Sequence, residues 1–190
     1  MSQRVGLLNK IAPLVPKDKL EFLANGLFYS KLLYCLPVFS NTWIGQTLDE
    51  DLRQFSAFTK EDMRKLQVLQ NKVLRLKCGL GYEARTTELV AKTGDLSVHQ
   101  LCAYTTLTTA HRAITTKKPH YLHNKLNLRN RDQIPLLPAR HEYTLDVGSK
   151  LTLVRGAFFY RASTLFNQLP LILRSCRDTK IFKKEVKRWV

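Results

Sequence analysis

The chain has 190 residues, of which 44% are apolar, and a formal net charge of +16. This apolar content is ordinary for a globular protein and is spread along the whole chain, which argues against intrinsic disorder. The longest apolar run, residues 26–39, contains Lys31 and Pro37 and is too short to span a bilayer, and residues 2–16 lack the pattern of a signal peptide. We therefore expect a soluble intracellular protein, cytoplasmic or nuclear, with one large domain or two small ones.

The surplus positive charge is confined to the part of the chain that follows Asp62. Residues 1–62 contain 7 Lys or Arg and 7 Asp or Glu, whereas residues 63–190 contain 24 Lys or Arg and 8 Asp or Glu. A field of one sign raises the local concentration of polyanions and speeds their association. Nucleic acid is the polyanion that we expect, because neutralising its phosphates releases condensed counterions.

The first half of the chain has the apolar spacing of helices. Leucines and other apolar residues three and four positions apart predict helices over residues 5–12 and 18–33. The clearest helix covers residues 60–76, with an apolar side made of Met63, Leu66, Leu69, Val73 and Leu76, and it ends at Gly79 and Gly81. Two further helices are predicted over residues 87–92, closed by Gly94, and over residues 98–116.

The amino-acid composition changes after residue 117, where prolines, asparagines and basic residues predict a linker. Residues 143–147 and 150–154 then flank Gly148-Ser149, which suits a β-hairpin. Helices are expected again over residues 157–167 and 178–189. In the first of these, the aromatic residues are expected to serve the core rather than to stack on bases; they are Phe158, Phe159, Tyr160 and Phe166.

The prediction is therefore a mainly α fold in three parts. Residues 1–117 form a helical domain, residues 118–142 form a linker rich in Pro, Asn and Arg, and residues 143–190 form a small C-terminal hairpin with terminal helices. The cysteines lie far apart with no CxxC pair, so we expect reduced thiols, some of them in the core; they are Cys35, Cys78, Cys102 and Cys176.

Two stripes of basic residues are the candidate functional sites. Each lies on the helix side opposite the apolar residues, where it could follow a phosphate backbone; the alternative is a solvated helix face without a ligand. The first stripe belongs to the helix over residues 60–76 and consists of Arg64, Lys65, Lys72 and Arg75, with Lys77 just beyond it. The second belongs to the last helix and consists of Lys183, Lys184, Lys187 and Arg188.

No motif in the chain predicts independent catalysis. There is no Asp-Asp pair to hold the two metal ions of a polymerase, no Gly-x-Ser-x-Gly elbow and no phosphate-binding glycine loop. The acidic run at residues 49–51 lies in a polar loop. His99-x-x-Cys102 and His120-x-x-His123 have spacings that suit zinc, but a weak helix and a proline loop separate the pairs, so a partly buried Cys102 and surface histidines are preferred. We expect no metal and no cofactor.

Five phrases in a fixed order carry a resemblance to a known family. They are QRVGLLNKI (Gln3–Ile11), LLYCLPVF (Leu32–Phe39), KLQVLQNKVLRLKCG (Lys65–Gly79), FFYRASTLFNQLP (Phe158–Pro170) and IFKKEVKRWV (Ile181–Val190). This succession resembles the region that follows the polymerase core in reverse transcriptases of jockey- and CR1-type non-LTR retrotransposons. The resemblance covers nearly the full chain.

The resemblance implies a helical thumb followed by a C-terminal extension. The thumb of that family holds the template–primer duplex against the catalytic palm, and the palm Asp-Asp is absent from this chain. The resemblance thus implies a non-catalytic fragment that binds RNA or DNA template–primer mainly through phosphates, with a separate palm segment as a further partner. Two alternatives stay open: an inert truncated relic, and a helical module that binds protein or a membrane surface.

Overall fold

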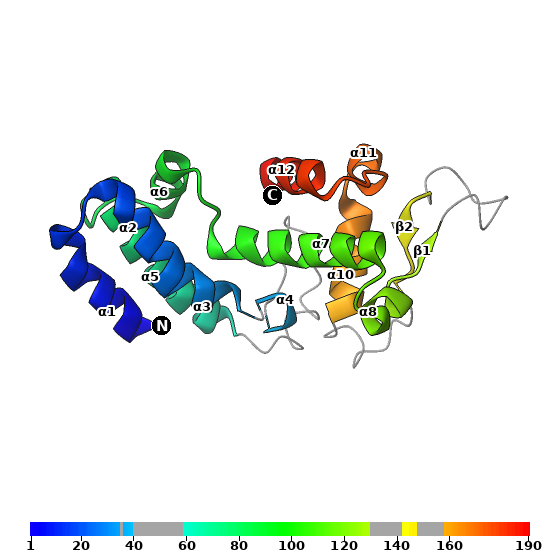
Figure 1. The fold of residues 1–190 in the computed structure, drawn as a ribbon, viewed down its shortest axis with the longest axis horizontal. Helices are drawn as coiled ribbons and strands as arrows, with labels where there is room; N and C mark the ends of the chain where they lie inside the picture. Colours follow the sequence, from blue (N-terminus) through cyan, green and yellow to red (C-terminus); the bar gives the residue numbers. More distant parts are fainter. Residues whose placement is uncertain (35, 40–58, 130–141, 148–157) are drawn as a thin grey trace. The chain divides into compact units, whose positions relative to one another are not determined.

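The computed structural model describes residues 1–34, 36–39, 59–129, 142–147 and 158–190. Contacts divide the chain into two compact units (Figure 1). Unit 1 comprises residues 1–36 and 58–101, and unit 2 comprises residues 37–57 and 102–190. The boundary between them falls inside the long helix α7 (Val98–Thr116), whereas the sequence predicts a domain boundary at residue 117. The difference arises because most of α7 packs into the C-terminal core.

Unit 1 is built from helices that follow one another along the chain. In order they are α1 (Ser2–Ile11), a 3-10 turn (Ala12–Leu14), α2 (Lys17–Ala24), a π-helical turn (Asn25–Tyr29), α3 (Ser30–Leu33), α5 (Lys60–Cys78) and α6 (Thr86–Thr93). Helices α1 and α2 both pack against α5, which is the central element of the unit (Figure 1).

Local chemistry explains where α5 begins and ends. At its start, the Thr59 hydroxyl accepts a hydrogen bond from the Asp62 amide, while the Asp62 carboxylate accepts one from the Thr59 amide. This capping box satisfies two backbone donors that a helix start leaves open. At its end, Gly79 takes a left-handed conformation with φ 67°, as the sequence predicted.

The buried side of α5 is shifted from the one that the apolar residues predicted. Met63, Gln70, Val73 and Leu74 are buried, whereas Leu69 is only half-buried. The buried Gln70 amide donates to the Leu96 carbonyl at 2.7 Å. A buried polar group with a hydrogen-bond partner can belong to a core, which apolar spacing alone does not reveal.

The π-helical turn lets two consecutive aromatic residues face the core. Phe28 and Tyr29 are both buried, with their rings in an edge-to-face arrangement at 5.3 Å between centroids. A regular α-helix would turn neighbouring side chains about 100° apart, whereas the extra residue of a π turn brings them closer to one face. The sequence predicted one uninterrupted helix over residues 18–33 and did not predict this turn.

Unit 2 contains the C-terminal part of α7 and shorter elements around it. They are α8 (His120–Lys125), β1 (Leu128–Arg129), β2 (Thr144–Leu145), α10 (Phe158–Gln168), α11 (Leu171–Arg174) and α12 (Thr179–Trp189). The short helix α4 (Leu36–Phe39) straddles the boundary between the units. In α10, the buried Arg161 donates to the Val38 carbonyl at 2.8 Å, which ties residues 37–38 to this unit.

The core of unit 2 joins α7, α10 and α12. Phe166 and Phe182 are almost fully buried in one cluster, as the sequence predicted for Phe166, and Phe158 and Phe159 pack against that cluster. The His111 ring of α7 stacks on Phe182 at 3.8 Å between centroids, and its Nε2 donates to the Cys176 carbonyl at 2.8 Å. The apolar side of α12 is therefore used for packing within the protein.

The small antiparallel sheet corrects the predicted linker. Leu128 pairs with Leu145 and Arg129 with Thr144, so residues 120–129 form α8 and β1 instead of an unstructured connection. The Asn167 side chain extends the sheet, because its amide donates to the Leu145 carbonyl at 2.9 Å and accepts from the Leu145 amide at 2.7 Å. Residues 150–154, the second strand of the predicted hairpin, lie outside the described residues.

The prediction of a mainly α fold with a small two-stranded sheet and C-terminal helices is confirmed. The bounds of α5, α6, α7, α10 and α12 lie within two residues of the predicted ones. The partner strand of residues 144–145 was not predicted, nor were the short helices α4, α8 and α11.

Candidate nucleic-acid interface

The first predicted stripe divides into exposed and occupied residues. Arg64, Lys65 and Lys72 are exposed on α5. Arg64 forms an ion pair with Glu61 at 2.9 Å on the same helix, which raises the pKa of Arg64 and lowers that of Glu61 through a charged hydrogen bond. Lys65 and Lys72 make no ion pair with another residue that the structure describes. They are the two exposed cations of this stripe that form no ion pair with the described residues.

Arg75 and Lys77 serve the fold of unit 1. Arg75 donates to the Ala84 carbonyl at 2.9 Å and lies over the Tyr82 ring, so it holds the turn that follows α5. The Lys77 side chain is 10% exposed and its ammonium contacts Asp95 at 2.6 Å. Lys77 lies seven residues from Gln70 and fourteen from Met63, and this spacing places it on the buried side of α5. The ion pair and the burial of Lys77 thus leave it poorly placed to present its charge to a ligand.

The Lys77 ammonium belongs to a small polar cluster. It lies 3.6 Å from Glu21 and over the Tyr29 ring at 5.8 Å, and the Tyr29 hydroxyl donates to Asp95 at 3.3 Å. Burial and the neighbouring Asp95 raise the pKa of Tyr29, so the phenol stays protonated. The cluster joins α2, the π-helical turn, α5 and the loop before α7.

All four residues of the second predicted stripe, on α12, are exposed. Asp178 caps this helix through the amides of Lys180 and Ile181, which lowers the pKa of the Asp178 carboxyl. Arg188 is held by Glu185 at 2.9 Å. Four lysines of α12 are exposed and form no ion pair within the described parts of the chain: Lys180, Lys183, Lys184 and Lys187.

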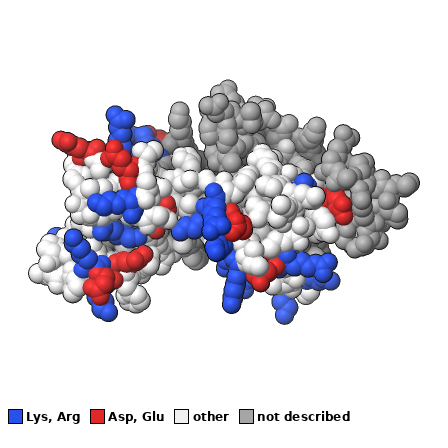
Figure 2. Space-filling view, turned by 90° about the horizontal axis from the view of Figure 1, so that it is seen from above, with Lys and Arg blue, Asp and Glu red and all other residues white. Residues whose placement is uncertain are grey.

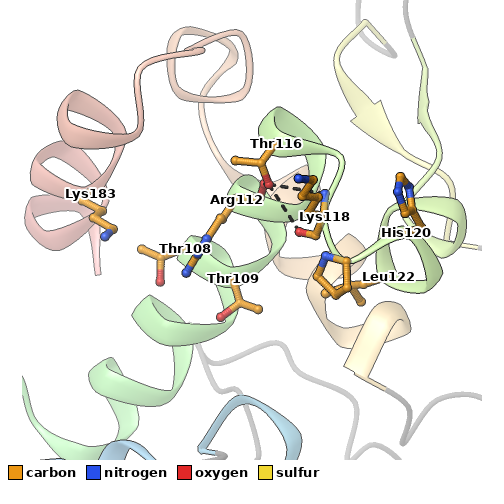
Figure 3. Close-up of a pocket in the computed structure, with 9 residues that line it drawn as sticks. Thr108, Thr109, Arg112, Thr116, Lys118, His120, Leu122 and Lys183 are labelled. Atoms are coloured by element: carbon orange, nitrogen blue, oxygen red, sulfur yellow. Dashed lines mark hydrogen bonds between the residues drawn. The ribbon is translucent and has the colours of Figure 1, made fainter.

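A groove of about 860 Å³ lies beside this helix in unit 2 (Figure 3). Its described lining combines hydroxyl, basic and apolar side chains and contains no Asp or Glu: Thr108, Thr109, Arg112, Thr116, Lys118, Pro119, His120, Leu122 and Lys183. Figure 3 shows the Lys183 ammonium turned toward the part of α7 that carries Thr108 and Arg112. The Thr116 hydroxyl donates to the Arg112 carbonyl at 2.7 Å and accepts from the Lys118 amide at 3.4 Å, which fixes the end of α7.

The two units differ in charge balance. In the described residues, unit 1 contains 13 Lys or Arg and 7 Asp or Glu, whereas unit 2 contains 13 Lys or Arg and 4 Asp or Glu. Figure 2 shows the Lys and Arg side chains of one face in separate groups, several with an acidic side chain beside them. Positive charge is thus local, and it gathers at the groove of unit 2, where none of the described lining residues is acidic.

Other predicted sites have these outcomes. Within the described residues, no group of three or more His, Cys, Asp or Glu side chains could hold a metal ion. Cys102 is buried and Cys78 and Cys176 are half-buried, and none of the three is in a disulfide bond among the described residues. The acidic residues 49–51 lie outside the described part of the chain. No helix in the described ranges is long and apolar enough to cross a membrane.

Arg112 and Lys118 are groove residues that the sequence did not predict. Arg112 stands alone among threonines and apolar residues in its helix, so it belongs to no basic stripe. Lys118 falls within the predicted linker. The signal that could have found them is the absence of any Asp or Glu between Asp95 and Asp132, a stretch with six Lys or Arg.

Comparison with known proteins gives no relative for this chain: no family model, no curated protein and no solved structure matches it.

Proposed function

We propose that this protein is a non-catalytic nucleic-acid-binding module that holds phosphates through the basic residues of unit 2. The single observation that carries the proposal is the set of four exposed α12 lysines that form no ion pair with the described residues, one of which lines a groove whose described lining has no acid. Contacts of this kind go mainly to phosphate and are weakly sequence-specific. The ordered phrases of the sequence support an origin in the thumb and C-terminal region of a non-LTR reverse transcriptase.

The apolar side of α12 argues against a membrane surface as the ligand. A helix that binds an anionic membrane inserts its apolar side between the lipids. In α12, Phe182 and Val186 are fully buried in the core of unit 2, so this side is already occupied. The same packing holds the lysine-bearing side outward, which suits a charged ligand that stays in water.

The test is a salt titration of binding to a short labelled oligonucleotide, followed by fluorescence anisotropy. If about six phosphates are engaged, log K falls with log salt at a slope of about −5. A variant with all four α12 lysines replaced by Gln should bind more weakly. Its slope should flatten by about 0.9 for each duplex phosphate that the variant no longer neutralises.

The matched control removes the same charge from unit 1. Lys10, Lys17, Lys31 and Lys92 are exposed, so their replacement by Gln leaves the fold intact. Replacing Lys65 and Lys72 by Gln tests the α5 stripe separately. Affinity that is independent of salt, or an equal loss in the unit 1 control, would contradict the proposal.

A further inference from the structure

The groove of unit 2 differs in form from a surface that receives a double helix. Duplex DNA is read when a protruding element, usually a helix, enters its major groove, which is about 12 Å wide. In unit 2 the basic side chains instead border a recess between α7, α8 and α12. A volume of about 860 Å³ falls within the range of about 300–1,000 Å³ that is usual for ligand sites.

The lining combines the two kinds of surface that a single strand needs. Single-stranded nucleic acid is held by cations that follow the backbone and by flat or apolar side chains that take the bases. Arg112 and Lys183 supply cations from two facing helices, and Lys118 supplies a third. Pro119, His120 and Leu122 form a wall of ring and aliphatic surface that continues from these cations.

The threonine hydroxyls suit this ligand as well. The Thr108 hydroxyl donates to the Thr105 carbonyl at 3.2 Å, and the Thr116 hydroxyl donates to the Arg112 carbonyl at 2.7 Å. Each hydroxyl therefore uses its hydrogen within the helix and keeps at least one oxygen lone pair, since Thr116 also accepts from the Lys118 amide, and this lone pair can accept from the N–H group of a base. Their methyl groups add apolar surface between the cations.

We infer that this groove binds a single-stranded segment of one or two nucleotides, with phosphates on Arg112, Lys118 and Lys183 and a base against Pro119, His120 and Leu122. The inference rests on the proposed function and adds to it the form of nucleic acid that unit 2 accepts. The lysines of α12 outside the groove, such as Lys187, contribute general attraction to either form.

The experiment compares a labelled oligothymidylate with a hairpin duplex of equal phosphate number, at fixed salt and pH 8. The wild-type protein should bind the single strand more tightly. Arg112→Gln should weaken single-strand binding about tenfold, as expected for loss of a charged hydrogen bond, and should change duplex binding less than twofold. Its salt slope for the single strand should flatten by about 0.7.

His120→Ala separates stacking from charge. This variant removes a ring but keeps all three groove cations, so it should weaken single-strand binding about fivefold or more while leaving the salt slope unchanged. Lys187→Gln is the matched control, because it removes an exposed α12 cation that does not line the groove. It should reduce single-strand and duplex binding by the same factor.

The outcomes distinguish the two proposals. If the wild-type protein binds neither probe at low salt, the proposed function fails and this inference falls with it. If the protein binds both probes but prefers the duplex, or if Arg112→Gln weakens both equally, the proposed function stands and the groove assignment is wrong. Arg112 is exposed and its side chain makes no intramolecular bond among the described residues, so Arg112→Gln should melt like the wild type.

Discussion

The two units contain the same number of basic residues in their described parts but use them differently. Unit 1 turns key cations inward: Lys77 is held by Asp95, and Arg75 holds the turn at Ala84. Unit 2 also buries one cation, Arg161, but its α12 lysines stay in solvent. The comparison teaches that net charge alone does not locate a binding surface, because part of the charge is consumed by the fold.

The largest expected effect tests whether the core of unit 2 holds α12, with its exposed lysines, in place. Phe182 is fully buried and stacks on His111, so it fastens α12 to the core. Phe182→Ala should destabilise the protein by about 3–5 kcal/mol, measured by urea unfolding, because it removes a large buried side chain and leaves a cavity. Oligonucleotide affinity should fall with it, since the lysines lose their common scaffold.

The neighbouring Ile181 offers the control for that experiment. It is 56% exposed on the same helix, so Ile181→Ala should change the free energy of unfolding by less than about 1 kcal/mol. Equal unfolding curves for the two variants would show that α12 is not docked through Phe182. The distinction between the units would then lose its structural basis.

The second-largest expected effect tests Lys77, the largely buried cation of unit 1. Lys77→Met keeps most of the aliphatic stem but leaves the Asp95 carboxylate without its ammonium. The pair is largely but not fully buried, so we expect a loss of about 2 kcal/mol in the free energy of unfolding, below the full cost of breaking a buried pair. Oligonucleotide affinity should stay unchanged.

Lys72→Met is the matched variant on the same helix. Lys72 is exposed and makes no ion pair with the described residues, so its replacement should cost less than about 0.5 kcal/mol. If Lys72→Met and Lys77→Met destabilise the protein equally, the polar cluster does not hold unit 1 together. If Lys77→Met weakens nucleic-acid binding in a folded protein, its charge reaches the ligand after all.

The sequence predicted the parts of the fold that local chemistry determines. Helix α5 has strong apolar spacing, a capping box and a C-terminal Gly79, and its bounds were predicted closely. The inclusion of Lys77 among the candidate binding residues rested on the residue type, although the Met63–Gln70–Lys77 spacing places it on the buried side of α5.

The groove could be predicted only in part, because tertiary packing assembles it. The basic stripe of α12 predicted Lys183, but Arg112 and Lys118 come from elements that carry no basic stripe. The strand pair of residues 128–129 and 144–145 joins segments that are distant in the chain, and two-residue strands have too little pattern to be recognised. Asn167 closes this sheet through a side chain, which no backbone propensity describes.

The smallest expected effect is the pH dependence of stability that the buried His111 gives to the core of unit 2. His111 is buried against Phe182, and this burial holds the pKa of His111 below its ordinary value of about 6.5. Below pH 6.5 the unfolded chain therefore binds a proton that the folded protein does not, so the free energy of unfolding falls as pH falls. Between pH 7.5 and 5.5 the loss from this group should be at most about 1.4 kcal/mol.

His111→Gln isolates this contribution, because the Gln amide can still donate to the Cys176 carbonyl and does not titrate. Burial also lowers the pKa of His99, so the wild type and His111→Gln should both lose stability in acid, and the wild type should lose more. Asp178, the carboxylate that interacts electrostatically with His111, has a lowered pKa, and its contribution disappears only below its ordinary value of about 4, outside this window. Identical changes between pH 7.5 and 5.5 for both proteins would mean that His111 is protonated as readily in the folded state as in the unfolded one, and that the aromatic packing of α12 does not depend on a neutral imidazole.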